Sequence, residues 1–302
     1  MRYDCAILGG GPAGLNAALV LGRARREVLL LDDGQPRNRV TRASHGFLTR
    51  DGVQPAEFRR LANEELARYP SVVAERQKVV RVSRTSSGFA LHTASGSQFE
   101  AGRILLATGL AESFPDIEGF GDFYGSSLFN CPYCDGWELR DKRLVLVSES
   151  AGAFHTAKLL YNWSKDLIVC TNWQTNLSAE QQIALHRKGI VVHTKPIAGF
   201  EGKDGQLEGV RFKDGTSIAR EGGFVTPRFA QKSDFGEQLG CEMNAYGAIV
   251  TDAFGRTSAR GVYAAGDSSV VSPSQLVIAA AEGSRAAMGV NADLTEDVFR
   301  GG

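Results

Sequence analysis

The sequence predicts an α/β protein with two domains, each organised around a βαβ unit. Two segments carry this prediction: residues 3–31 run through an apolar strand, a glycine turn, a helical stretch and a second apolar strand, and residues 143–170 repeat that order. Such crossovers join parallel strands and place helices over the sheet. The length of 302 residues also exceeds what one hydrophobic core usually supports, which favours two cores.

The N-terminal elements follow from short apolar runs and from apolar residues at helical spacing. In order, the sequence predicts a strand at 3–8, a helix at 13–25, a strand at 28–31, an antiparallel pair at 79–82 and 89–93, and a buried strand at 103–107 that ends at Thr108 and Gly109.

The middle and C-terminal elements follow from the same patterns, and two polar interruptions divide the chain. The predicted elements are a strand at 143–147, a helix at 153–163, a strand at 167–170, a strand at 261–265 and a helix at 275–291. Pro, Ser and polar residues interrupt the pattern near 113–116 and 228–233. We therefore expect a discontinuous domain, 1–114 and 233–302, into which residues 115–232 are inserted.

The composition is that of an ordinary soluble globular protein. Hydrophobic residues make up 43% and charged residues 23%, and Lys+Arg and Asp+Glu are both 34, so net charge offers no general attraction to nucleic acid or to an anionic membrane. No apolar run approaches the roughly 18 residues of a membrane helix. Five cysteines in a chain of this length do not form a disulfide framework, so we expect a cytoplasmic protein.

A glycine loop follows the first predicted strand. Residues 9–14 read Gly-Gly-Gly-Pro-Ala-Gly, which matches G-x-G-x-x-G between a strand and a helix. In such a loop the first glycine makes the turn, the second leaves room for a pyrophosphate and the third lets helix and strand approach. The alternative is a tight turn without a ligand. The predicted dinucleotide-binding residues of the loop are Gly9, Gly11, Pro12, Ala13 and Gly14.

An acid ends the second predicted strand, where a dinucleotide site needs a ribose acceptor. Asp32 lies at the expected distance from the glycines, and Asp33 is the alternative acid.

Cys131 and Cys134 are separated by two residues, a spacing typical of redox chemistry or of half a zinc site. Zinc is disfavoured because no second C-x-x-C and no H-x-x-x-H complete four ligands. Two inert buried thiols are the remaining alternative. Cys5 and Cys170 lie in apolar strands and are expected in the core, and Cys241 has no assigned role.

These motifs resemble those of the low-molecular-weight thioredoxin-reductase-like flavoproteins, over nearly the whole chain. The strand ending at Gly109 is similar to the family's second dinucleotide-binding stretch, and residues 131–136, Cys-Pro-Tyr-Cys-Asp-Gly, are similar to its redox motif. The resemblance implies bound FAD, a homodimer, and two Rossmann-like (three-layer ββα) dinucleotide-binding domains, the second inserted into the first.

Further flavin contacts come from the same resemblance. Residues 257–267 are similar to the family segment whose aspartate bonds the flavin ribityl chain, which assigns that role to Asp267, after Gly266. An ordinary turn or cap acid is the alternative. Gln275 and Leu276 match the segment against the isoalloxazine, where helix N–H groups stabilise reduced flavin. Residues 45–47 are assigned to the border of the ring.

The resemblance also assigns roles around the cysteine pair. Cys134 is expected to face the flavin and Cys131 to exchange with the substrate. Asp135 is expected to act as general acid and base, which requires a raised carboxyl pKa from partial burial. Asp135 stands where many oxidase-type relatives have His, which favours a reductase.

The chain departs from the family at the second nucleotide loop. Relatives that use NADPH carry G-x-G-x-x-A, and residues 148–153 here read Ser-Glu-Ser-Ala-Gly-Ala. Ser148 and Ser150 crowd the pyrophosphate space, Glu149 adds like charge, and the arginine pair for the 2'-phosphate is absent from residues 171–174. NADPH is therefore disfavoured. Relatives without the motif use ferredoxin, pass electrons to oxygen or recruit another flavin, so a second FAD in the middle domain stays open.

Three tryptophans flank this degenerate loop. We interpret Trp137, Trp163 and Trp173 as core packing, with stacking on a flavin or adenine ring as the alternative.

The sequence thus predicts an FAD-dependent disulfide oxidoreductase that passes electrons between flavin and the Cys131/Cys134 pair. The expected partner is a thioredoxin-like protein or a small disulfide or dithiol, and the expected donor is not NADPH but ferredoxin or a second flavin. One alternative is a dithiol oxidase that uses O2. The other is a flavin-binding sensor or interaction module without turnover.

Overall fold

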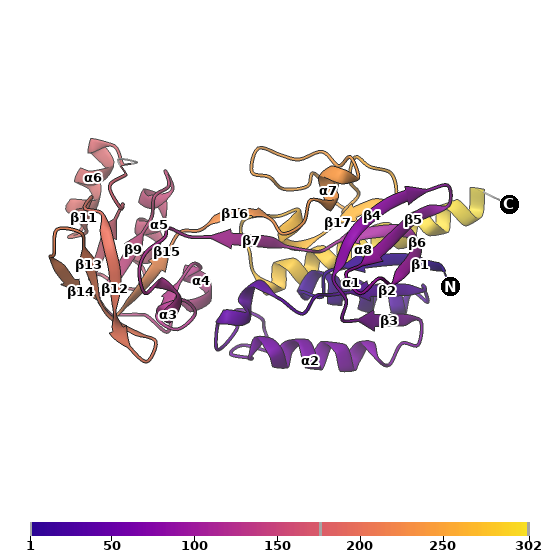
Figure 1. Ribbon diagram of the computed structural model, residues 1–302, viewed down its shortest axis with the longest axis horizontal. Coiled ribbons are helices and arrows are strands. Elements are labelled where there is room, and N and C mark those ends of the chain that lie inside the picture. Colours follow the sequence, from indigo (N-terminus) through magenta and orange to yellow (C-terminus); the bar gives the residue numbers. More distant parts are fainter. Residues whose placement is uncertain (1, 175–176, 301–302) are drawn as a thin grey trace. The chain divides into compact units, whose positions relative to one another are not determined.

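The computed structural model describes residues 2–174 and 177–300, which form two compact units (Figure 1). Unit 1 comprises Met1–Arg39, Gly46–Ala111 and Phe229–Gly302, and unit 2 comprises Val40–His45 and Glu112–Arg228. The short segment Val40–His45 is the main difference from the boundaries that the sequence suggested. It joins unit 2 because Gly125, with φ +86°, leaves space for the Val40 backbone: a Cβ on Gly125 would lie 2.3 Å from the Val40 carbonyl oxygen.

Unit 1 is built on a seven-stranded sheet of order β3-β2-β1-β6-β5-β4, with β17 paired to β6. Strands β1, β2, β3, β6 and β17 run parallel, and β4 and β5 form an antiparallel ribbon that pairs with the start of β6. The strands are β1 (Arg2–Leu8), β2 (Val28–Leu31), β3 (Val72–Glu75), β4 (Val79–Thr85), β5 (Gly88–Thr93), β6 (Gln98–Leu106) and β17 (Val262–Ala264).

The core of unit 1 lies on both faces of this sheet. In β1, Ala6 and Leu8 join one apolar cluster, and Cys5 and Ile7 join the cluster on the opposite face. This division follows from the period of two along a strand, and it explains why the central strands read as unbroken apolar runs. Cys5 is fully buried, as the sequence predicted.

The helices of unit 1 are α1 (Pro12–Arg23), α2 (Pro55–Leu66), α7 (Phe235–Gln238), α8 (Leu276–Arg300) and the short 3-10 helices η1 (Arg37–Val40) and η2 (Gly266–Ser268). Helices α1 and α8 pack closely because Gly283 has no side chain: a Cβ there would lie 2.0 Å from the Ala13 carbonyl oxygen. This packing holds the start of α1 against the C-terminal part of the chain.

Unit 2 has a five-stranded parallel sheet of order β11-β10-β9-β15-β8 and a three-stranded antiparallel sheet of order β12-β13-β14. The strands are β8 (Leu128–Phe129), β9 (Leu144–Val147), β10 (Leu167–Cys170), β11 (Val191–His193), β12 (Ile197–Lys203), β13 (Gln206–Phe212), β14 (Ser217–Ala219) and β15 (Gly222–Val225). The helices are α3 (Phe120–Phe123), α4 (Pro132–Asp135), α5 (Ala153–Leu160) and α6 (Ala179–His186). Strands β7 (Leu110–Ser113) and β16 (Arg228–Gln231), at the joints of the two units, pair with each other.

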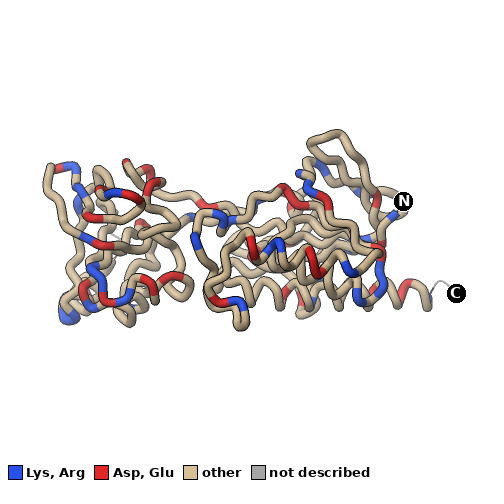
Figure 2. Tube along the Cα trace, turned by 90° about the horizontal axis from the view of Figure 1, so that it is seen from below, with Lys and Arg blue, Asp and Glu red and all other residues tan. Residues whose placement is uncertain are grey.

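The predicted α/β class and the two Rossmann-like folds are confirmed by these parallel sheets. Acidic and basic residues are both scattered along the chain trace (Figure 2). Among the described residues, no helix is both long and apolar enough to cross a membrane.

Candidate active site

The loop between β1 and α1 depends on glycine at two positions for steric reasons. Gly9 has φ +109°, and a Cβ there would lie 2.2 Å from the Ala107 carbonyl oxygen. A Cβ on Gly14 would lie 1.8 Å from the Gly9 carbonyl oxygen. Gly11 differs, because no atom lies within 4 Å of the position its Cβ would take. The side of the loop at Gly11 is therefore open, whereas Gly9 and Gly14 face the chain itself.

Asp32, rather than Asp33, is bonded to this loop. Its carboxylate accepts hydrogen bonds from the backbone N–H groups of Gly10 at 2.9 Å and Gly34 at 3.1 Å, and it pairs with the Arg59 guanidinium. Asp33 instead pairs with Lys232, at 3.2 Å.

The other predicted cofactor residues gather at the carboxyl ends of β1, β6 and β17. Gly109 donates its N–H to the Ser268 hydroxyl at 2.8 Å, which ties the end of β6 to the segment that follows β17. A Cβ on Gly266 would lie 2.8 Å from the Ala13 Cβ, so the turn before Asp267 lies directly against the start of α1. Residues far apart in the chain thus meet at one edge of the parallel sheet, the place where such folds bind ligands.

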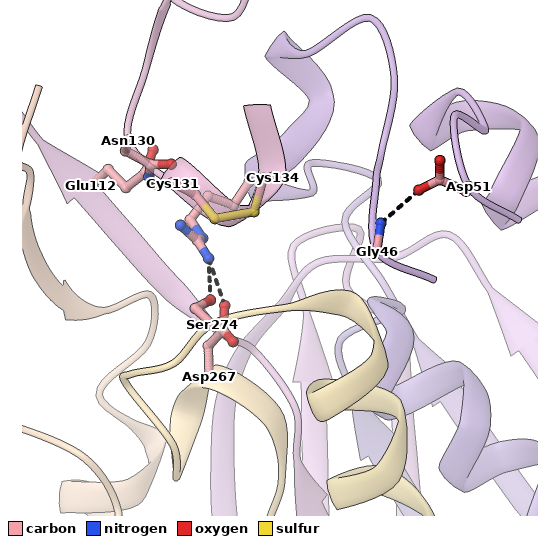
Figure 3. The surroundings of a disulfide bond; sticks show 9 residues. Gly46, Asp51, Glu112, Asn130, Cys131, Cys134, Asp267 and Ser274 are labelled. Carbon is pink, nitrogen blue, oxygen red and sulfur yellow. Dashed lines mark hydrogen bonds and ion pairs between the residues drawn. A yellow bond between two sulfur atoms is a disulfide. The ribbon is translucent and has the colours of Figure 1, made fainter. Parts of the chain in front are cut away.

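Asp267 is held by an arginine that the sequence analysis did not single out. The Arg37 guanidinium donates to the Asp267 carboxylate at 2.9 Å and also to the Ser274 hydroxyl (Figure 3). The same guanidinium lies 5.4 Å from the centre of the Phe229 ring. Arg37 therefore joins η1, η2 and the segment before α8.

The segment assigned to the border of the flavin ring is divided between the two units. Gly46 belongs to unit 1, where its N–H donates to the Asp51 carboxylate at 2.8 Å (Figure 3). A Cβ on Gly46 would lie 4.0 Å from the Gln275 side-chain nitrogen, so Gly46 and Gln275 are neighbours, and Leu276 begins α8 directly after. His45 belongs to unit 2.

The two predicted redox cysteines in unit 2 form a disulfide, with their Cα atoms 5.3 Å apart (Figure 3). Cys131 has extended backbone angles and precedes α4, and Pro132 takes the first helical position, where its missing N–H costs nothing. This turn brings Cys134 back onto Cys131. Both cysteines are half-buried.

The three other cysteines differ from this pair in their surroundings. Cys5 and Cys170 are fully buried in central strands, and Cys241 is buried beside the Thr257 hydroxyl. Burial raises the pKa of all three thiols, to about 12 for Cys170, which keeps them protonated and unreactive.

Asp135 follows Cys134 in α4 and is the one acid among the described residues that is buried. Burial and, to a smaller extent, the nearby negative charge of Glu138 raise its carboxyl pKa to about 7 against the opposing effect of His45. The His45 Nε2 atom lies 3.6 Å from the Glu138 carboxylate, so both groups belong to one cluster with Asp135. A carboxyl group with such a pKa can give and take protons near neutral pH.

A second polar group precedes the disulfide. The Glu112 carboxylate accepts from the Asn130 side-chain amide and, at 2.8 Å, from the Tyr124 hydroxyl. Figure 3 shows Glu112 and Asn130 beside Cys131. This network fixes the residue immediately before the redox pair.

The interpretation of the three tryptophans as core packing is wrong for Trp137 and Trp173, which are 66% and 70% exposed. The Arg140 guanidinium lies 4.1 Å from the centre of the Trp137 ring, and Trp173 lies in a turn with φ +63°. Trp163 packs edge-on against Tyr133 and lies against Gly136, where a Cβ would approach its ring to 2.8 Å.

The loop between β9 and α5 of unit 2 is closed by its own side chains. The Ser148 and Ser150 hydroxyls lie 3.2 Å apart, and Ser150 accepts from the Gly152 N–H at 3.3 Å. The Glu149 carboxylate accepts from the Asn172 side-chain amide at 2.7 Å and lies 3.5 Å from the Arg228 guanidinium.

Comparison with known proteins agrees with this arrangement. The family model described as pyridine nucleotide-disulphide oxidoreductase matches residues 3–283. The chain belongs to this family. A crystal structure assigned as thioredoxin reductase TrxB of Bacillus anthracis is 46% identical, covers 98% of this chain and 100% of its own, and superposes with a TM-score of 0.95.

Two curated relatives of this chain are thioredoxin reductases by name. Thioredoxin reductase aclD of Aspergillus oryzae is 30% identical and covers 98% of this chain and 97% of its own. The thioredoxin reductase of Helicobacter pylori is 27% identical over 95% and 97%. The predicted thioredoxin-reductase-like family is confirmed, and the chain is an oxidoreductase that acts on sulfur groups.

Membership of the family implies FAD, and the residues of unit 1 fit it. The open space at Gly11 would accept a pyrophosphate, and the start of α1, with no acid in its first turn, offers positive dipole density to it. Asp32 follows β2 and Asp267 follows β17, at the carboxyl edge of the same parallel sheet, where ribose and ribityl hydroxyls would be bound.

Proposed function

We propose that this member of the family transfers electrons between FAD in unit 1 and the Cys131–Cys134 disulfide of unit 2, and from there to a thioredoxin-like protein or a small disulfide. The observation that carries the proposal is the disulfide followed directly by a buried acid whose pKa is raised to about 7. Bound FAD, once reduced by the electron donor, would supply the electron pair that reduces the disulfide.

The cysteines would then act by thiol-disulfide exchange. The Cys131 thiolate attacks the substrate disulfide, forms a mixed disulfide and releases one substrate thiolate, which takes up a proton. The Cys134 thiolate attacks the Cys131 sulfur, re-forms the intramolecular disulfide and releases the second substrate thiol. The substrate gains one electron pair and the cysteine pair loses one. Asp135 supplies the proton for a leaving thiolate in its neutral form and removes a thiol proton in its charged form.

We further propose that the electron donor is not NADPH. A pyridine nucleotide needs a loop whose backbone can approach its pyrophosphate, and the loop at Ser148 and Ser150 is bridged by side-chain hydroxyls instead. The Glu149 carboxylate stands in the same loop and would repel the phosphates. We therefore propose ferredoxin or a second flavin as the electron donor.

An anaerobic titration of the FAD-loaded protein with dithionite tests the coupling of flavin and disulfide. The native protein should take up one electron pair per chain more than its flavin needs, because the disulfide also becomes reduced. The variant Cys131→Ser/Cys134→Ser is the control and should stop at the flavin. Equal uptake by the two proteins would show that flavin and disulfide do not exchange electrons, as in a sensor or interaction module without turnover.

The same protein decides the direction of electron flow. Reduction of a thioredoxin-like substrate by pre-reduced protein, without oxygen, is the expected result. If a dithiol instead reduces the flavin and oxygen reoxidises it with formation of hydrogen peroxide, the protein is a dithiol oxidase and the reductase assignment is wrong.

A further inference from the structure

The loop that follows β9 in unit 2 contains a negative charge of its own. Strand β9 lies between β10 and β15 in the parallel sheet, and the chain leaves β9 toward α5 and β10. The carboxyl end of β9 is therefore the point where a doubly wound sheet binds nucleotides, with the phosphates at the start of the following helix. Glu149 is the second residue after β9 and lies four residues before α5 begins.

The position of this carboxylate is fixed by contacts with other elements of the unit. The Asn172 side-chain amide donates to one Glu149 oxygen at 2.7 Å. The Asn172 side-chain oxygen Oδ1 accepts from the Ile197 backbone N–H at 2.8 Å. Asn172 takes φ +47°, a backbone conformation that asparagine tolerates better than most residues. Glu149 is thus linked through Asn172 to the start of β12, and its side chain is only 19% exposed.

The serines of the loop are a weaker obstacle than the carboxylate. The hydrogen bond from the Gly152 N–H to Ser150 is 3.3 Å long, and that from the Ser150 N–H to Ser148 is 3.5 Å, so both N–H groups could be released to a phosphate. A hydroxyl can itself donate to a phosphate oxygen, whereas a carboxylate can only accept. Removing the carboxylate also removes a like charge, which the serines do not carry.

We infer that Glu149, held by Asn172, is the specificity-determining residue that excludes pyridine dinucleotides from unit 2, because its carboxylate adds a fixed negative charge to the loop between β9 and α5 that the phosphates would approach. The inference rests on the proposed function, in which NADPH is not the donor. Removal of the Glu149 charge should give the crevice a measurable affinity for NADP⁺, and glycine at positions 148 and 150 should add to that affinity only when Glu149 is absent.

The test is a calorimetric titration of FAD-loaded protein with NADP⁺, which binds without reducing the flavin. We expect no saturable binding to the native protein or to Ser148→Gly/Ser150→Gly, weak binding to Glu149→Ser, and the tightest binding to Ser148→Gly/Glu149→Ser/Ser150→Gly. Each step that removes the charge should strengthen binding by roughly tenfold or more, with a marked dependence on salt. Glu180→Ser, which removes an exposed acid from the first turn of α6, is the matched control and should bind no NADP⁺.

The outcomes separate the inference from the proposed function. Saturable NADP⁺ binding by the native protein, with flavin reduction by NADPH, would overturn both. No binding by the triple variant would overturn the role of Glu149 and leave the donor assignment intact. Equal binding by the glycine double variant and the triple variant would have the same two consequences. If the triple variant does not fold, as judged by flavin content and thermal unfolding, Glu149→Ser and Glu149→Gln decide: both must bind better than the native protein, and equal absence of binding overturns the inference.

Discussion

The two strand-to-helix loops of this protein, Gly9–Gly14 in unit 1 and Ser148–Ala153 in unit 2, follow the same architecture with opposite polarity. In unit 1 the loop donates: the Gly10 N–H bonds to Asp32 at the end of the next strand. In unit 2 the loop accepts: the Glu149 carboxylate bonds to the Asn172 amide after the next strand. The first loop is therefore open to an anion, and the second already holds one.

The difference teaches that the fold alone does not determine what a crevice binds. Both loops lie between a central parallel strand and a helix, and both helices have no acid in their first turn. The few side chains in the loop and at the end of the neighbouring strand decide whether the helix start is available to a ligand.

The largest expected effect comes from closing the open loop. In Gly11→Val the new Cβ has no atom within 4 Å apart from its chain neighbours, and φ is −77°, which valine adopts without strain, but the side chain fills the room left for a pyrophosphate. The variant should fold and be purified without flavin, which the visible absorbance per chain measures. Gly152→Val in unit 2 is the matched control and should keep the flavin of unit 1. A yellow Gly11→Val protein would contradict the assignment of this loop to the cofactor.

Sequence patterns located the glycine loop and the cysteine pair because the information that defines each of them is local. Gly9, Gly11 and Gly14 lie within six residues, and Cys131 and Cys134 within four, so spacing alone predicts their structure. The buried strands could be found for the same reason, because their apolar runs are continuous.

Contacts between distant segments could not be found in this way. Arg37 and its partner Asp267 are 230 residues apart in the sequence. Arg59, in α2, pairs with Asp32, which follows β2. Neither arginine belongs to a recognisable motif, and the sequence around an arginine does not reveal which acid it pairs with. The end of α8 was missed for another reason: residues 292–300 are polar and exposed for the most part, so the apolar pattern fades before the helix ends at Arg300.

A second prediction distinguishes the two units by the pH dependence of their stability. Because the pKa of Asp135 is about 7 in the folded protein and near 3.8 when unfolded, the folded state binds more protons between these values. The contribution of Asp135 to the free energy of unfolding is then fully present below about pH 4 and is lost as the pH rises through 7. The loss is on the order of 4 kcal/mol at most. Asp135→Asn should remove this slope, and its advantage over the native protein should grow as pH rises.

The chain allows this to be measured unit by unit. All three tryptophans, at 137, 163 and 173, belong to unit 2, so their fluorescence follows the unfolding of that unit, and flavin fluorescence follows unit 1. We expect the pH slope in the tryptophan signal only. Disulfide exchange by Asp135→Asn should also be slow at every pH and lose its inflection near 7. A native pH profile in the variant would remove Asp135 from the proton transfer.

A smaller effect concerns the acid that supports the open loop. Asp32→Ala leaves the Gly10 and Gly34 N–H groups without their acceptor and Arg59 without its partner, and it removes the candidate ribose acceptor. We expect FAD to bind more weakly by about 1–3 kcal/mol, roughly tenfold to a hundredfold, measured by flavin release during dilution. Asp33→Ala, which loses the pair with Lys232 and the hydrogen bond from the Gln35 N–H but no contact with the glycine loop, should bind FAD nearly as the native protein does. Equal losses in the two variants would argue that neither acid is specific to the loop.

The smallest effect tests whether the closed loop is held by the contact that distinguishes it from the open one. In a double-mutant cycle of Glu149→Ala and Asn172→Gly, the hydrogen bond between the two side chains should appear as a coupling of about 0.5–1.5 kcal/mol in the unfolding of unit 2. Glycine is the appropriate replacement at Asn172, because it accepts the φ of +47° without strain and isolates the side-chain contribution. Denaturant unfolding followed by tryptophan fluorescence gives the four stabilities. Strictly additive effects would mean that Asn172 does not hold the carboxylate, and that the closed loop owes its conformation to Ser148 and Ser150 instead.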